Sequence, residues 1–181
     1  MLFMLLFAEA VDVRDVATAW VNHHNQAIEL LDAGDSKEAL VHAKMAADLA
    51  PSTRQKSALE VLAMAASSEH DVVTECDALD ALMAYGKPKW GLYWNGALDA
   101  QSQQMWASAY RYAQVAFEHG TDPEATAPLA FSTALRVNQL DQAQAAMAHF
   151  ENPLAKQDLA QALAADGRCE EAKKWDASAC Q

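Results

Sequence analysis

The sequence predicts an all-α protein made of about five antiparallel helical hairpins stacked into a solenoid. Composition favours helix almost throughout, because the 181 residues include only six glycines and five prolines and because β-branched residues rarely cluster. Small residues also recur at a nearly constant interval. The steps that connect Ala39, Thr74, Ala109, Ala143 and Ala172 are 35, 35, 34 and 29 residues long. A period of this length is typical of proteins built from repeated helical pairs.

Five helical pairs can be delimited by this period and by turn signals between them. The expected pairs are 20–33 with 36–50, 53–68 with 71–85, 90–103 with 105–119, 123–137 with 140–150, and 153–165 with 169–179. Asp122 before Pro123 is typical of a helix start, and Gly86 and Pro88 separate the second and third pairs. Pro128 falls inside an expected helix, where it predicts a kink or a later start.

A ridge of small side chains marks the second helix of each pair. Side chains three and four residues apart lie on one face of a helix, and small ones allow neighbouring helices to approach more closely than leucine would. The successive ridges are Ala39, Ala43 and Ala46; Thr74, Ala78 and Ala81; Ala109, Ala113 and Ala116; Ala143 with Met147 and Phe150; and Ala172. One pair cannot bury its own apolar face, so stability comes from stacking on neighbouring pairs.

The first pair carries further signals around its ridge. Gly34 and Asp35 stand at the turn, Ala39 and Ala46 are the small residues, and Pro51 closes the pair. This pattern resembles the second half of a tetratricopeptide repeat, a helical hairpin of about 34 residues. The resemblance covers roughly 20–179 and implies a right-handed α-solenoid, a TPR-like superhelix. It places one domain over 11–181, with repeats at about 20–51, 53–86, 90–120, 123–152 and 153–181.

The resemblance also implies which residues face a concave groove lined by the first helices. Asn25 and Asn95 occupy a position at which peptide-binding members often hydrogen-bond the ligand backbone. The lysines of the family's carboxylate-binding clamp are replaced by His24, Leu59 and Trp94, so we do not expect recognition of a C-terminal acidic peptide. The implied groove residues are His24, Asn25, Ile28, Leu31, Asp32, Lys56, Leu59, Glu60, Ala63, Trp94, Asn95, Leu98, Gln101, Leu129, Ser132 and Arg136. We expect a mixed apolar and amide groove with Trp94 and Asn95 near its centre.

Charge and motifs exclude several classes of function. The formal net charge is −12, from 25 acidic and 13 basic side chains without a basic cluster, so a phosphate backbone would be repelled and no nucleic-acid partner is expected. The sequence contains no HExxH, no GxSxG and no glycine-rich phosphate loop. Adjacent His23 and His24 point about 100° apart on a helix and cannot share a metal ion. We expect neither an enzyme, nor a cofactor, nor a metal site.

The acidic residues of the second pair are interpreted as a solvated helix surface rather than as catalytic carboxylates. Acid and base catalysis by two carboxyl groups needs them to converge on a cleft, which their spacing does not indicate. These residues are Glu60, Glu69, Glu75, Asp77 and Asp80.

The first ten residues allow two interpretations. Residues 1–7 are wholly apolar and are followed by Ala8, Glu9 and Ala10, a small-x-small pattern suited to signal peptidase, although no Lys or Arg precedes the run. The run is also far shorter than the roughly 20 residues of a transmembrane helix. The sequence favours an export signal over 1–10 and an extracytoplasmic location. The alternative is an apolar helix end in a cytoplasmic protein.

The three cysteines predict neither a zinc site nor a disulfide. They contain no CxxC pairing, and their number is odd. Cys169 and Cys180 are eleven residues apart, and a continuous helix between them would separate their Cα atoms by about 16 Å, well beyond disulfide reach.

Two functional hypotheses follow, and both concern interaction rather than catalysis. The first is a module that binds a peptide or protein partner in the concave groove. The second is an assembly component that self-associates or docks through its convex or end surfaces. The sequence leaves the oligomeric state open.

Overall fold

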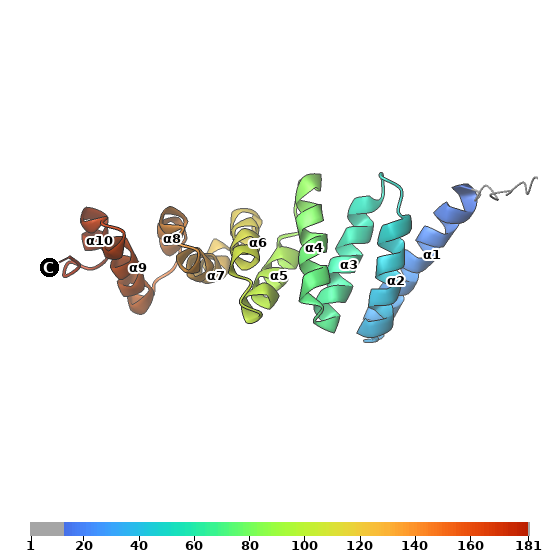
Figure 1. Cartoon of the computed structure of the whole chain (residues 1–181), viewed down its shortest axis with the longest axis horizontal. Coiled ribbons are helices and arrows are strands. Elements are labelled where there is room, and N and C mark those ends of the chain that lie inside the picture. Colours follow the sequence, from blue (N-terminus) through green and yellow to red (C-terminus); the bar gives the residue numbers. More distant parts are fainter. Residues whose placement is uncertain (1–12, 181) are drawn as a thin grey trace, which may run out of the picture.

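The computed structural model describes residues 13–180, which fold into a row of α-helices with no strand among them (Figure 1). A short 3₁₀ helix, η1 (Met83–Tyr85), follows α4. The helices are α1 (Val13–Asp32), α2 (Ser36–Leu49), α3 (Gln55–Glu69), α4 (Val72–Leu82), α5 (Trp90–Ser102), α6 (Trp106–His119), α7 (Pro123–Arg136), α8 (Leu140–Met147), α9 (Pro153–Ala165) and α10 (Cys169–Trp175).

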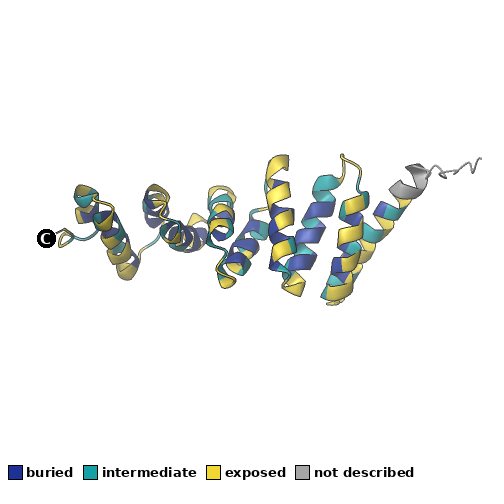
Figure 2. Ribbon diagram, viewed as in Figure 1, coloured by how far each residue is buried: buried dark blue, intermediate teal, exposed yellow. Residues whose placement is uncertain are grey.

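Consecutive helices form hairpins, and the hairpins lie side by side along the molecule (Figure 1). Each second helix also contacts the first helix of the following hairpin, and α1, α3, α5 and α7 contact one another in succession. The expectation of an all-α solenoid of helical hairpins is confirmed. Figure 2 shows the buried residues concentrated where helices face each other and the exposed residues on the outside.

The expected helix bounds hold within a few residues, with three exceptions, in α1, α8 and α10. α1 begins at Val13 rather than Trp20, because no helix-breaking residue lies between them. α7 has its expected bounds: it begins at Pro123 and continues past Pro128, so the later start that Pro128 suggested is wrong. Pro128 is exposed in the second turn, where its missing N–H costs a single backbone bond. α8 ends at Met147 and α10 at Trp175, each before the residue expected from the period.

The alanine ridges are buried as expected, with one exception. Ala39, Ala43 and Ala46 of α2 and Ala109 and Ala116 of α6 are all 0% exposed. Ala81, expected at the end of the second ridge, is exposed, and the neighbouring Leu82 is buried instead. Leu82 follows Ala78 by four residues on the buried face of α4, whereas Ala81 lies outside that face.

All five hairpin turns contain a residue in the left-handed region, although only two of these residues are glycine. Gly34 and Gly167 have φ near +80°, and the other turns place His70, Gln104 and Asn138 at φ of 60°, 60° and 57°. The His70 N–H bonds back to carbonyl oxygens of α3, as at many helix C-termini. The turn geometry therefore persists where the sequence lacks its preferred residue.

Replacing His70 by glycine is expected to stabilise the fold. A side chain in the left-handed region costs about 1–2 kcal/mol. Glycine avoids this cost but loses more conformational entropy on folding, so the net gain is smaller. We expect His70→Gly to raise the free energy of unfolding by about 0.5–1 kcal/mol in urea denaturation. His70→Ala is the control, since it keeps the strained φ, and an equal gain in both variants would contradict the explanation.

The expectation that Cys169 and Cys180 are unbonded is wrong. The two cysteines form a disulfide, with their Cα atoms 5.8 Å apart. α10 ends at Trp175, and a turn then brings the chain back, held by Asp176 Oδ1, which accepts bonds from the Ser178 N–H and Oγ–H at 2.9 and 2.7 Å. Cys76, the other cysteine, is free and buried.

The disulfide predicts a local stabilisation of the last hairpin. Nearest-neighbour stacking confines the effect of a change to adjacent repeats. We expect the Cys169→Ser, Cys180→Ser variant to lose amide hydrogen-exchange protection in α9 and α10 while α1 and α2 keep theirs. Mass spectrometry after alkylation of the denatured, unreduced wild type should find a single modified cysteine, Cys76. Modification of all three would contradict the bond.

Candidate functional site

The first helices of the hairpins form one continuous surface, which we call the first-helix face. It comprises α1, α3, α5 and α7, and each of these helices contacts the next in the series. Asn25 and Ile28 of α1 and Asn95 and Leu98 of α5 are exposed, all four being implied groove residues. The face therefore presents both amide and apolar side chains.

A cavity of about 270 Å³ opens where three of these helices meet, and we call it the Glu75 cavity. It brings together Leu31, Asp32, Ala63 and Asn95 from the implied groove set. Its lining comprises Leu31, Asp32, Ala63, Met64, Ser67, Ser68, Glu75, Leu92 and Asn95. All come from α1, α3 and α5 except Glu75, which reaches the cavity from α4.

Glu75 is buried, so its interpretation as part of a solvated helix surface is wrong. The residue is 2% exposed, and its Oε2 has no hydrogen-bond partner among the described residues. The Asp99 carboxylate and the Ser67 hydroxyl are its polar neighbours. Ser67 Oγ donates to Asp99 Oδ2 at 2.8 Å. The site thus places two carboxyl groups from different helices close together.

The surroundings of Glu75 favour its neutral form. Burial raises the pKa of Glu75 to about 8. The negative charge of Asp99 and a hydrogen bond with it act in the same direction, and the nearby Ser67 hydroxyl opposes them. At neutral pH the carboxyl group is therefore largely protonated and can donate as well as accept hydrogen bonds.

Gly96 allows α5 to approach Glu75 closely. A Cβ atom at this position would lie 2.2 Å from Leu79 Cδ1 and 3.3 Å from Glu75 Oε1. Leu79 is fully buried. Glycine is therefore required here by the space between α4 and α5 rather than by a turn.

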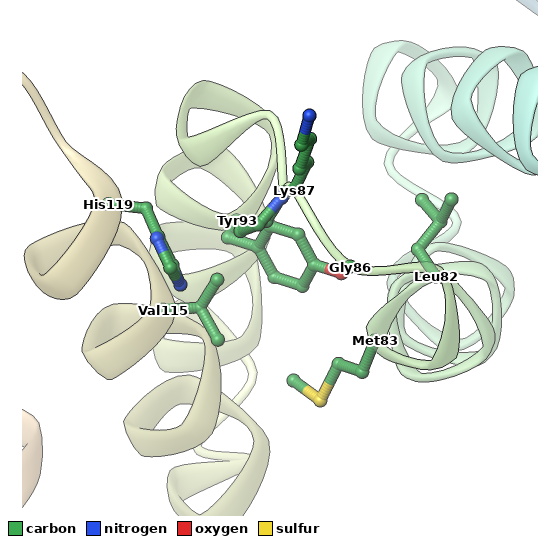
Figure 3. Close-up of a pocket in the computed structure, with 8 residues that line it drawn as sticks. Leu82, Met83, Gly86, Lys87, Tyr93, Val115 and His119 are labelled. Carbon is green, nitrogen blue, oxygen red and sulfur yellow. The ribbon is translucent and has the colours of Figure 1, made fainter.

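A second cavity, of about 330 Å³, lies at the connection between the second and third hairpins (Figure 3). In Figure 3, Tyr93 of α5 and Val115 and His119 of α6 face this space from one side and Met83 of η1 from the other. The complete lining is Leu82, Met83, Gly86, Lys87, Pro88, Tyr93, Val115 and His119. None of these was expected in a site, and the signal available was the Gly86 and Pro88 pair, interpreted only as a separator.

Three implied groove residues of α3 have structural contacts. Lys56 Nζ donates to the carbonyl oxygens of Gly86 and Lys87 at 2.8 and 3.0 Å. Glu60 Oε2 pairs with Lys89 Nζ at 2.6 Å. Leu59 is buried. The two polar residues thus fasten the segment 86–89 to α3.

Other implied groove residues also contact their own chain. The His24 ring stacks on Trp20 with centroids 5.2 Å apart, and burial lowers the pKa of His24. Trp94 is half-buried and packs against the core, and Gln101 is half-buried. The structure gives two further contacts: Ser132 Oγ donates to the Leu129 carbonyl at 3.1 Å, and the Arg136 guanidinium lies 5.0 Å from the Trp106 ring centre.

Comparison with known proteins identifies the fold. No protein-family model matches the sequence, and neither does any curated protein. Among solved structures, the chain is similar to YrrB, described as a TPR protein with an unusual peptide-binding site. The TM-score is 0.57 at 15% identity, over 84% of this chain and 80% of YrrB. The chain has the tetratricopeptide-repeat fold.

Within this tetratricopeptide-repeat fold, the Glu75 cavity occupies the surface of the first helices of repeats one to three. The described residues contain no group of three His, Cys, Asp or Glu side chains able to hold a metal ion. No helix within residues 13–180 has the length and apolar character needed to span a bilayer. The polar groups at the Glu75 cavity are the carboxyl groups of Glu75 and Asp32, the hydroxyls of Ser67 and Ser68 and the amide of Asn95.

Glu75 predicts a pH dependence of stability. Below pH 4.5, the ordinary pKa of glutamate, the carboxyl group is neutral in both the folded and the unfolded protein. Between pH 4.5 and about 8 it is neutral in the folded protein and ionised in the unfolded protein. The free energy of unfolding should fall by about 1.4 kcal/mol per pH unit across this interval and level off above it. Glu75→Gln removes this contribution, so the variant gains stability relative to wild type as pH rises.

Denaturation of both proteins across this pH range measures the effect. Asp77→Asn is the matched control, because Asp77 is exposed on the same helix. Parallel pH profiles for wild type and Glu75→Gln would show that the buried carboxyl group does not titrate as described.

Proposed function

We propose that this protein is a non-enzymatic interaction module that binds a peptide or protein segment on its first-helix face. The observation that carries the proposal is the Glu75 cavity, an opening between three first helices that ends at a buried carboxyl group with an unpartnered oxygen. Concave sites with a few convergent polar groups and a perturbed titratable residue are the usual form of binding sites.

The exposed side chains around the cavity suit an extended peptide. Asn25 and Asn95 offer amide groups that can bond a peptide backbone, and Ile28 and Leu98, 37% and 42% exposed, offer apolar contacts. The helices are held in place by their packed ridges, so binding costs little ordering of the protein. The peptide-binding site described for YrrB belongs to a protein of this same fold, which supports the proposal.

We further propose that the protein functions outside the cytoplasm, with a cytoplasmic location as the alternative. The Cys169–Cys180 disulfide supports the proposal, because such bonds persist mainly in oxidising compartments. The candidate export signal at residues 1–10 lies outside the described residues. The net charge of −12 supports a protein partner over a nucleic acid. Fractionation of the native host followed by immunoblotting tests the location.

Exposed apolar side chains on the second helices support the alternative function, that of an assembly component. Val41 and Met45, one turn apart on α2, are 45% and 46% exposed, and Val73 on α4 is 65% exposed. Exposed apolar side chains of this kind occur at interfaces between proteins. An assembly component would use this convex surface to self-associate or to dock.

Peptide binding should depend on α5 rather than on α2. Peptides selected on the wild type from a displayed random library would be tested by calorimetry against the Asn95→Ala, Leu98→Ala variant. We expect the affinity to fall at least about tenfold, since truncating central contacts costs about 1–2 kcal/mol or more. The matched control is Val41→Ala, Met45→Ala, for which we expect wild-type affinity.

The reverse pattern would support the alternative. If only the α2 variant loses peptides, or if light scattering shows oligomers that this variant abolishes, the convex surface is the interaction site. Circular dichroism must show equal helicity for both variants.

A further inference from the structure

Glu75 occupies a position that is apolar in the first repeat. It follows Leu40 by 35 residues, precedes Tyr110 by 35, and the next residue in register is Gln144. Leu40 is buried in the core. A carboxyl group at a core position costs free energy unless it is compensated, so its presence over a cavity calls for a ligand that compensates it.

The carboxyl groups near the cavity have no cationic partner among residues 13–180. Some acidic residues elsewhere are paired, as with Lys44 and Asp71 at 3.1 Å and Arg111 and Asp80 at 2.9 Å. By contrast, neither Glu75, Asp32 nor Asp99 forms a salt bridge with any described residue. The cavity therefore offers acceptor oxygens, and carboxyl groups that no cationic side chain of the described residues pairs with.

The cavity also has the size and the lining for a long side chain. A single water needs about 10–15 Å³, and this cavity measures about 270 Å³. Leu31, Met64 and Leu92 provide an apolar wall, and Ser67, Ser68 and Asn95 provide hydrogen-bonding groups. An apolar stem that ends in a cationic group matches this combination, and lysine and arginine have this form.

We propose that the Glu75 cavity binds the cationic end of a lysine or arginine side chain of the partner peptide, with its stem against the apolar wall. The inference rests on the proposed function and assigns the chemistry of its anchor residue. Metal binding is a poorer match, because the described residues contain no group of three metal-ligating side chains.

Binding of a cation is coupled to loss of the Glu75 proton. The groups around Glu75 are Asp32 from α1, the Ser67 hydroxyl from α3, Asp99 from α5 and its own neighbour Cys76 on α4. None of these supplies positive charge. The raised pKa of Glu75, about 8, means that a bound cation must favour the ionised form, so affinity should increase from about pH 6.5 to about pH 8.5.

The test uses N-acetyl-arginine amide as the probe and N-acetyl-citrulline amide as its neutral, isosteric control. In nitrogen-correlated NMR titrations we expect the arginine probe to shift the amide signals around Ser67, Asn95 and Asp99, with at least about tenfold weaker binding of the citrulline probe. Glu75→Gln should weaken arginine binding to a similar degree and abolish its pH dependence. Asp77→Asn should leave both unchanged.

A second variant and a metal probe complete the design. Asp32 is exposed, so Asp32→Asn is expected to fold normally and to weaken arginine binding as well. Equal binding of both probes, wild-type binding by Glu75→Gln, or stronger effects of calcium chloride on the same amides would each overturn the inference. Library peptides that bind the first-helix face without a basic residue would overturn this inference and leave the proposed function intact. Loss of peptide binding only in the α2 variant would overturn the proposed function.

Discussion

Close contact between helices through alanine is the constraint on which this structure depends. Ala39, Ala46, Ala109 and Ala116 are completely shielded from solvent, although each contributes only a methyl group. The stabilisation therefore comes from the short distance between helices, which brings backbone and larger side chains on both sides into contact. Enlarging one of these fully buried alanines would push the neighbouring helices apart.

The same close packing explains how a polar site can exist in so simple a fold. α5 reaches α4 because Gly96 has no side chain, and this approach buries Glu75 beside Asp99. A carboxyl group in such a place destabilises the stack, whereas leucine holds the corresponding position of α2. The second repeat thus places a titratable group with a raised pKa in its core, a combination often found at functional sites.

Sequence periodicity predicted the fold well because the determinants of a repeat are local. Turn residues, ridges and N-caps such as Asp122 recur within each hairpin, and Asp122 Oδ1 accepts the bond from Ala125 N–H at 3.1 Å. The disulfide was missed because it depends on a turn after Trp175 that has no periodic signal. Glu75 was misinterpreted because its burial depends on Gly96 of the following hairpin, a contact that no spacing within α4 reveals. The Glu75 cavity was therefore not predictable from spacing along the sequence.

The connection between the second and third hairpins has a mechanical consequence. Segment 86–89 is fastened to α3 by side chains, through Lys56 and through the Glu60–Lys89 pair, and the apolar cavity lies beside it. Solvent-exposed hydrogen bonds and ion pairs break more readily than the close packing of buried alanine side chains. Under a bending load this joint should therefore be more compliant than the packing of α2 on α3. Because Glu75 and Gly96 lie on opposite sides of the joint, bending there would change the width of the cavity itself.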